Sequence, residues 1–228
     1  MKEKRDIYRT ALTAALLPLT ALLILWITRP FPELLSSNSA SVSSLSRAQK
    51  ANIGLASAKI DRLVLRPGER FSFNNRVGRR TVDRGFRAAP TYENGKTIKT
   101  EGGGVCLLSS LLYKSALEAG LGIIERQPHS RPISSMPPGL DATVTFGKFD
   151  LVFENTTAAP ILIECAYAAD NGAKVDVHIR GKLGAVGEEN PTKVFSGPLE
   201  RSGDQLKVSI YRKQAGRTSL VSSDTYKL

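Results

Sequence analysis

Apolar and polar residues recur with two different periods along this chain, and these periods predict its helices and strands. Residues 47–61 carry apolar side chains at helical spacing, which predicts a short amphipathic helix. Residues 105–119 repeat the pattern with a stronger apolar stripe, and Gly120 directly after it is a typical end for a helix. The second helix therefore lies in the middle of the chain, directly after a run of three glycines.

Strand patterns surround these two helices. Residues 63–65 form a short apolar run, and Phe71 and Phe73 alternate with polar residues in a second predicted strand. Asn94-Gly95 is a strong signal for a hairpin turn within residues 92–98. Six later stretches also have strand character, namely residues 142–146, 149–153, 160–167, 174–180, 206–212 and 219–222. Together these elements predict an α+β fold with a mostly antiparallel sheet and a central helix that follows the glycine-rich loop.

The first residues of the chain have a different character. Residues 11–28 are uncharged and predominantly apolar, and as a helix they would be about 27 Å long, close to the thickness of the bilayer core. Four basic residues precede them, which predicts a cytoplasmic N-terminus and an extracytoplasmic remainder: Lys2, Lys4, Arg5 and Arg9. We expect an uncleaved transmembrane anchor, with a cleaved signal peptide as the alternative, and both place the remainder outside the cytoplasm.

The sequence predicts four parts in order. Residues 1–28 form the cytoplasmic N-terminus and the transmembrane anchor, and residues 29–46, rich in Ser, Pro and Asn, are expected to be a linker. Residues 47–190 form the main domain, and residues 191–228 are expected to be a C-terminal β extension.

The composition narrows the classes of partner. The net charge of +11 favours anionic surfaces or polymers, but the basic residues are scattered and lack interleaved aromatic residues, so nucleic acid is not the expected partner. The chain has two cysteines and two histidines, too few at close spacing for a structural zinc site, and we expect neither a metal nor a cofactor. Cys165 has the position of a core residue on a strand, although a bridge between Cys106 and Cys165 stays open in an oxidising compartment.

Cys106 is the first candidate for chemistry. It follows Gly102-Gly103-Gly104 and falls in the first turn of the central helix. Unpaired backbone amides and the helix dipole favour negative charge there, so a thiolate nucleophile and an oxyanion are both expected to be stabilised. The alternative is a small buried residue that only helps the helix to pack.

A cysteine nucleophile requires a general base. His129 lies in an irregular segment between prolines, the kind of loop that holds catalytic groups, whereas His178 lies on the polar face of a predicted strand. Asp141 starts a predicted strand and could orient the imidazole of His129, with Asp150 as a second candidate carboxylate.

These stretches together resemble the VanW-like family. The matching motifs cover residues 52–181 and are Arg66-Pro-Gly-Glu-Arg-Phe-Ser-Phe-Asn74, Val77-Gly78, Gly85-Phe86, Gly102-Gly-Gly-Val-Cys106, Ser110, Leu112-Tyr113, Ala119-Gly-Leu121, Glu125-Arg126, His129-Ser130, Pro138-Gly139, Asp141-Ala-Thr-Val144 and Asp150-Leu-Val-Phe-Glu-Asn155. The glycine–cysteine motif and the His-Ser and Asp-Ala-Thr-Val motifs are the specific ones. Members of the family often have Gln after the cysteine, where this chain has Leu107.

The resemblance implies an extracytoplasmic envelope protein of the kind found in vancomycin-resistance gene sets. Some members are implied to be L,D-transpeptidases that cross-link peptidoglycan through the motif cysteine. That role would fall on Cys106, with His129 as general base and acid and Asp141 as the residue that orients it. The residues expected to bind substrate or the oxyanion are Gly102, Gly103, Gly104 and Ser130.

Three hypotheses for function follow. The first is this peptidoglycan transpeptidase in the cell membrane, which attacks tetrapeptide stems and releases D-Ala. The second is a non-catalytic module that binds or scaffolds the wall, and the third is a cysteine hydrolase that transfers the acyl group to water. The expected partners are peptidoglycan stem peptides or other anionic wall polymers, together with the membrane itself.

Overall fold

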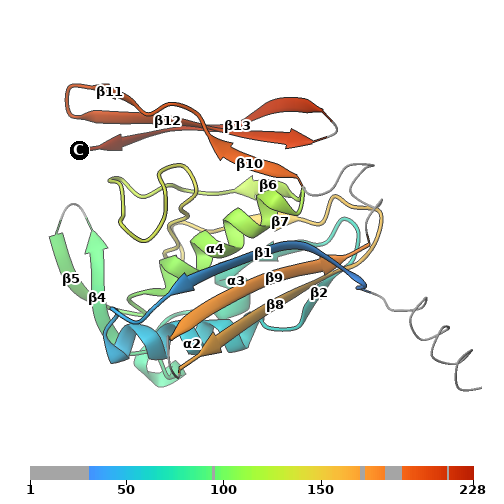
Figure 1. Ribbon diagram of the computed structural model, residues 1–228. Coiled ribbons are helices and arrows are strands. Elements are labelled where there is room, and N and C mark those ends of the chain that lie inside the picture. Colours follow the sequence, from blue (N-terminus) through green and yellow to red (C-terminus); the bar gives the residue numbers. More distant parts are fainter. Residues whose placement is uncertain (1–30, 94–95, 170–172, 183–191, 215) are drawn as a thin grey trace, which may run out of the picture.

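A four-stranded antiparallel sheet forms the base of the protein. The computed structural model describes residues 31–93, 96–169, 173–182, 192–214 and 216–228. The strand order in the main sheet is β1 (Glu33–Ser41), β9 (Lys174–Gly181), β8 (Ile161–Ala168) and β2 (Leu63–Leu65). Every second residue of β9 is buried, so one face of the sheet packs against the core (Figure 1).

Two helices of 14 residues each pack on this sheet, as the helical periods predict. Helix α2 (Arg47–Ile60) lies against β8, and α4 (Val105–Glu118) lies against β1, β9 and α2. Ser46 caps α2 through a reciprocal pair of hydrogen bonds with Gln49. The apolar stripe of α4 is buried in the core, and Gly120 has the left-handed conformation (φ 76°) expected after a helix.

Smaller elements surround the two helices. A three-stranded antiparallel sheet has the order β3 (Arg70–Ser72), β7 (Val152–Glu154) and β6 (Gly122–Glu125), and β4 (Ala88–Glu93) pairs with β5 (Lys96–Glu101). The predicted hairpin is thus confirmed, while its turn, Asn94-Gly95, lies outside the described residues. A single turn of 3-10 helix, η1, spans Val82–Arg84.

Phe73 starts the short helix α3 (Phe73–Val77) instead of continuing the preceding strand. The side chain of Ser72 accepts a hydrogen bond from the backbone N–H of Asn75, and Asp150 accepts one from Asn74, so polar caps end the strand. The strand prediction is therefore correct at Phe71, which lies in β3, and wrong at Phe73.

The C-terminal residues form a sheet of their own. Strand β12 (Gln205–Gln214) pairs along one edge with β10 (Lys193–Ser196) and β11 (Glu200–Ser202), and along the other edge with β13 (Arg217–Lys227). Figure 1 shows this sheet, in red, on the other side of α4 from β8. The two strands predicted here are confirmed, and both are longer than the sequence pattern indicated.

The segment between β6 and β7 departs from prediction. Residues 142–146 were expected to be a strand, but they lie in a loop with isolated bridges from Gln127 to Thr143 and from Thr145 to Phe149. The physical reason is that side chains of α4 form hydrogen bonds with backbone groups that would otherwise bond to a neighbouring strand. The backbone N–H of Ala142 donates to Ser110 Oγ, for example, over 2.9 Å. The strand expected at residues 149–153 is confirmed only at its end, where Val152 and Phe153 belong to β7.

The predicted linker is also incorrect over Glu33–Ser41, because this stretch forms β1 at the edge of the main sheet. The predicted transmembrane segment, residues 11–28, lies outside the described residues. Among the residues that the structure does describe, no helix has the length and apolar character that crossing a bilayer requires.

We predict that β1 is an integral part of the folded domain. Leu35 is only 3% exposed whereas its neighbour Leu34 is 48% exposed, so the two leucines form a matched pair. Leu35→Ala should lower the free energy of unfolding in urea by about 2–5 kcal/mol, the usual cost of such a cavity. Leu34→Ala should lower it by less than about 1 kcal/mol. Equal, small losses for both variants would show that the strand detaches in solution.

Candidate active site

Cys106 lies in the first turn of α4, and the preceding glycines allow the chain to reach it. Gly104 is the residue before the helix and has φ 99°, a conformation that L side chains rarely adopt. A Cβ atom on Gly103 would lie 2.4 Å from the carbonyl oxygen of Ala89, so no side chain fits there. The three-glycine run therefore has a steric cause, and it lets the loop pass close to β4.

The thiol of Cys106 is partly exposed and lies among backbone groups. Its Sγ is 3.9 Å from the carbonyl oxygen of Val144, and both cysteines are free, so no bridge to Cys165 forms. In the described part of the chain, no acceptor takes the backbone N–H of Gly104 or of Cys106. Such amides at a helix start can stabilise an anion on the sulfur or on a bound substrate.

His129 and Asp141 form the pair that the sequence predicted. His129 Nδ1 is 2.6 Å from Asp141 Oδ2, and the backbone N–H of His129 donates to the same oxygen over 2.7 Å. Asp141 is 1% exposed, so its carboxylate is held in a dry environment. Because two bonds fix His129 to one oxygen, the ring orientation is set and Nε2 is the nitrogen that remains for Cys106.

The environment of His129 favours its charged form. Burial alone lowers the pKa of the imidazole, but the hydrogen bond to Asp141 and the interactions with Cys106 outweigh it and raise the pKa to about 9. At neutral pH the ring therefore carries a proton, and Nδ1 donates to the carboxylate. An imidazolium beside Cys106 is the partner that a thiolate nucleophile needs.

Two further side chains hold Asp141. Arg126 donates from Nη2 to Asp141 Oδ1 over 3.2 Å, and Tyr226 donates its hydroxyl to the same oxygen over 2.5 Å. Burial raises the pKa of the Asp141 carboxyl, but the bonds from His129 and Tyr226 and the charge of Arg126 lower it below its usual range. Arg126 is itself paired with Asp224 at 2.6 Å, so the buried charges form a continuous network.

Two serines on α4 join the helix to the segment that carries Asp141. Ser109 Oγ donates to the carbonyl oxygen of Ala142 over 2.6 Å, and Ser110 Oγ donates to that of Cys106 and accepts from Ala142 N–H. These bonds fix Cys106 relative to Asp141, because both serines lie on the turn that follows the cysteine.

The other predicted residues lie in different surroundings. Ser130 is exposed, and its carbonyl oxygen accepts a hydrogen bond from the backbone of Lys227. Cys165 is buried, which raises the pKa of its thiol, as expected for a core residue. His178 lies on β9, opposite Glu164, and is not part of the Asp141 network. Asp150 binds Ser72 and the start of α3 and is not the partner of His129.

Sequence reasoning missed the residues that support the pair: Ser109, Ser110, Arg126, Asp224 and Tyr226. Two of them lie on β13, more than 80 residues after Asp141. Arg126 was quoted as part of a motif, but nothing in the sequence shows that it points at a buried carboxylate. The one available signal for Arg126 was its position in the sequence shortly before His129 and Asp141.

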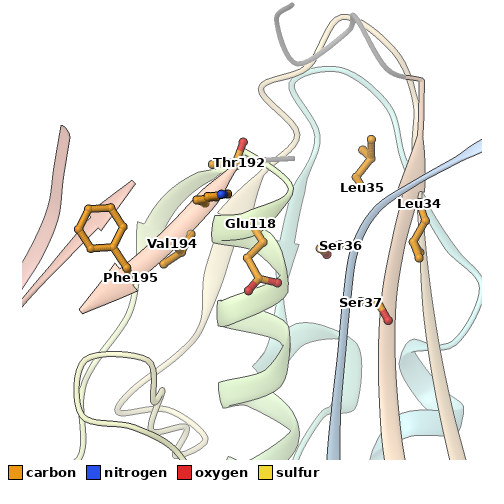
Figure 2. A pocket seen from close by; sticks show the side chains of 9 residues that line it. Leu34, Leu35, Ser36, Ser37, Glu118, Thr192, Val194 and Phe195 are labelled. Carbon is orange, nitrogen blue, oxygen red and sulfur yellow. The ribbon is translucent and has the colours of Figure 1, made fainter. Parts of the chain in front are cut away.

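A groove elsewhere on the surface has no comparable chemistry. It holds about 490 Å³ between β1, the last turn of α4 and β10, and Figure 2 shows Leu35, Val194 and Phe195 along it. The carboxylate of Glu118 in this groove is taken by Asn38 at 2.6 Å. Cys106, His129 and Asp141 do not line it.

Fold and site together define an α+β protein with a cysteine–histidine–aspartate cluster at the start of a central helix. The profile of the family described as VanW like protein matches residues 48–179, more than half of the chain. This chain therefore belongs to the VanW-like family. The match includes Cys106, His129 and Asp141 but ends before the C-terminal sheet.

Two curated relatives match about half of the chain. The chain is 41% identical over 121 residues to the uncharacterized protein YoaR of Bacillus subtilis (strain 168), covering 53% of this chain and 40% of that protein. It is 35% identical over 121 residues to the vancomycin B-type resistance protein VanW of Enterococcus faecalis (strain ATCC 700802 / V583), covering 51% of this chain and 42% of that protein. The matches thus span well under half the length of either relative. No solved structure matches the chain significantly.

We predict that the proton on His129 depends on Asp141. The chain has two histidines, so ring signals in NMR spectra can be assigned with a His178→Gln variant. The His129 signals should titrate with a midpoint near 9 in the unmodified protein. In Asp141→Asn the midpoint should fall by one or more units, because the carboxylate that favours the charged ring is gone. An unchanged midpoint would mean that Asp141 does not set the state of this ring.

The same shift makes a prediction for stability. The pKa of His129 is raised in the folded state above the value of about 6.5 for an unfolded chain. Its contribution to stability is therefore fully present below pH 6.5 and is lost as the pH rises through about 9. Urea unfolding should show the unmodified protein losing its advantage over His129→Gln between pH 6.5 and 10. A constant or growing difference would contradict the sign of this shift.

We also predict that the C-terminal sheet supports the site. Tyr226→Phe removes the hydroxyl that donates to the buried Asp141 carboxylate and accepts from the backbone N–H of Gly139. It should lower the free energy of unfolding by about 1.5–3 kcal/mol. Tyr211→Phe is the control, since its ring keeps its stacking on Phe195 and its hydroxyl has no partner in the described part of the chain. That variant should change stability by less than about 0.5 kcal/mol. Similar effects of both variants would contradict the special role of Tyr226.

Proposed function

We propose that this protein is a cell-envelope enzyme, an L,D-transpeptidase that cross-links peptidoglycan stems through a thioester on Cys106. Membership of the VanW-like family and the relative named for vancomycin resistance support the envelope context. The observation that carries the catalytic part is the hydrogen bond between His129 Nδ1 and the buried Asp141, together with the raised pKa of His129, to which Asp141 and Cys106 both contribute.

In the first step Cys106 Sγ attacks the carbonyl carbon of the L,D peptide bond that precedes the terminal D-Ala of a tetrapeptide stem. The N–H groups of Gly104 and Cys106 stabilise the negative charge on the carbonyl oxygen. The C–N bond then breaks, and the imidazolium of His129 gives its proton to the leaving amine, so that D-Ala departs. The product is a thioester between Cys106 and the shortened stem.

In the second step an amine from another stem attacks the thioester carbon. Neutral His129 takes the proton from this amine, the C–S bond breaks, and the thiolate is regenerated beside the imidazolium. Asp141 keeps its negative charge throughout and stabilises the charged ring in both steps.

The departure from the family at Leu107 fits this proposal. Leu107 is 7% exposed and belongs to the hydrophobic core, so its side chain packs the first turn of α4 against the rest of the domain. Residues 11–28, outside the described residues, would hold the enzyme in the cell membrane with its domain outside.

The test is mass spectrometry of the purified protein incubated with a defined tetrapeptide stem. We expect an adduct on Cys106 with the mass of the stem minus D-Ala, and a cross-linked product once an acceptor amine is added. Cys106→Ala should lose both signals, whereas Cys165→Ala should keep them because Cys165 is buried on β8.

Three outcomes are separable. Release of free tripeptide with an acceptor present would identify a hydrolase. Stem binding without any adduct would favour a wall-binding module. Cross-linking by the Cys106→Ala variant would show that Cys106 is not the nucleophile.

A further inference from the structure

Arg80 is a buried arginine without an ion pair. It is 8% exposed, and within the described ranges of the chain no carboxylate oxygen comes within ion-pair distance of it. Buried charges are usually paired, because an unpaired one carries a large desolvation cost. Arg126 shows the usual arrangement, with Asp141 and Asp224 as its partners. Arg80 thus has no carboxylate within ion-pair distance among the described residues, and only the longer-range charges of Asp150 and Cys106 act on it.

The guanidinium of Arg80 is held in one orientation. Its Nη1 donates to Asn74 Oδ1 over 2.6 Å and to the carbonyl oxygen of Gly78 over 3.2 Å. Asn74 is in turn fixed by a hydrogen bond from its Nδ2 to the carbonyl oxygen of Phe149 over 2.8 Å. The other two nitrogens of Arg80 have no hydrogen bond among the described residues, and neither is sealed from solvent. Two donors of an oriented fork therefore remain available to a ligand.

Arg80 also lies beside the cysteine site. A Cβ atom on Gly102 would lie 2.4 Å from Arg80 Cβ, so the first glycine before α4 makes room for the stem of this arginine. Burial lowers the pKa of the guanidinium, and negative charge on Cys106 and Asp150 acts in the opposite direction. The carboxylate oxygens of Asp150 accept hydrogen bonds from Ser72 Oγ and from the backbone N–H of Asn74 at the start of α3. The stem of Arg80 thus packs against the glycine run that leads to Cys106, and the charges of Arg80 and Cys106 act on each other.

We propose that Arg80 binds the terminal carboxylate of the acyl-donor peptide, so that the enzyme accepts donors that end one residue after the attacked carbonyl. This inference rests on the proposed function and adds to it the residue that selects such donors. In such a donor only the amide nitrogen and one α-carbon separate the attacked carbonyl from the carboxylate. A carboxylate this close to the reacting carbon requires a fixed cation beside the nucleophile, and the planar fork of arginine matches both of its oxygens.

The experiment compares two tetrapeptide stems that differ only at their C-terminus, one with a free D-Ala carboxylate and one with D-alaninamide. With the full chain, the kcat/KM for release of the last residue should be about 10- to 100-fold higher for the free acid, as expected for a charge-assisted pair of hydrogen bonds. Arg80→Gln should remove most of this preference by slowing the acid and leaving the amide almost unchanged. Arg80→Lys should keep part of it, since the charge remains without the fork.

Arg76→Gln is the matched control. It removes the same charge from an exposed position on α3, four residues earlier, and should keep the preference for the acid. Thermal unfolding of each variant checks that the domain stays folded. A wild-type enzyme that uses acid and amide equally, or a preference that survives in Arg80→Gln, would overturn the role of Arg80 and leave the transpeptidase intact.

A binding measurement separates this inference from the proposed function. The rate at which iodoacetamide alkylates Cys106 is followed with either peptide present. Stronger protection by the acid than by the amide in the wild type, lost in Arg80→Gln, supports the carboxylate site even if neither peptide is turned over. Equal protection by both peptides in the wild type would overturn it.

Discussion

The buried carboxylate of Asp141 joins parts of the chain that are far apart in sequence. It accepts hydrogen bonds from the backbone and ring of His129, from Arg126 and from Tyr226, while almost none of its surface reaches solvent. A buried charge is tolerated only when several donors compensate for the lost water. Each of these donors must therefore be in place, and the position of the loop that carries His129 follows from this requirement.

The residues of the site come from segments inside the family match and from segments outside it. The match covers residues 48–179 and so includes Cys106, His129 and Asp141. Asp224 and Tyr226, which complete the network around Asp141, lie on β13 beyond that match, and β1 pairs with β9 from the other side of it. The C-terminal sheet is thus more than an appendage, because it closes the dry environment in which His129 holds its proton. The two buried arginines differ in their partners. Arg126 pairs with Asp141 and Asp224 within this network, whereas Arg80 is proposed to bind the carboxylate of the substrate.

The sequence predicted what local pattern controls. Both long helices and the strands β8, β9, β12 and β13 followed from periodicity and turn residues, and the pairing of His129 with Asp141 followed from motif chemistry. The predictions are wrong where contacts between residues far apart in the sequence determine the structure. Glu33–Ser41 resembles a polar linker because an edge strand has few apolar residues. Residues 142–146 alternate like a strand, but the serine side chains of α4 bond both backbone groups of Ala142. Tyr226 could not be assigned, since no local signal connects a strand residue to a carboxylate 85 positions earlier.

The central claim is that Asp141 and His129 make Cys106 a reactive nucleophile. The most direct measurement is the second-order rate of Cys106 alkylation by iodoacetamide at pH 7, compared between the wild type and His129→Gln, with peptide mapping to exclude Cys165. The account predicts that the wild type reacts at least about tenfold faster, because the imidazolium stabilises the thiolate. Equal rates in the two proteins would contradict it.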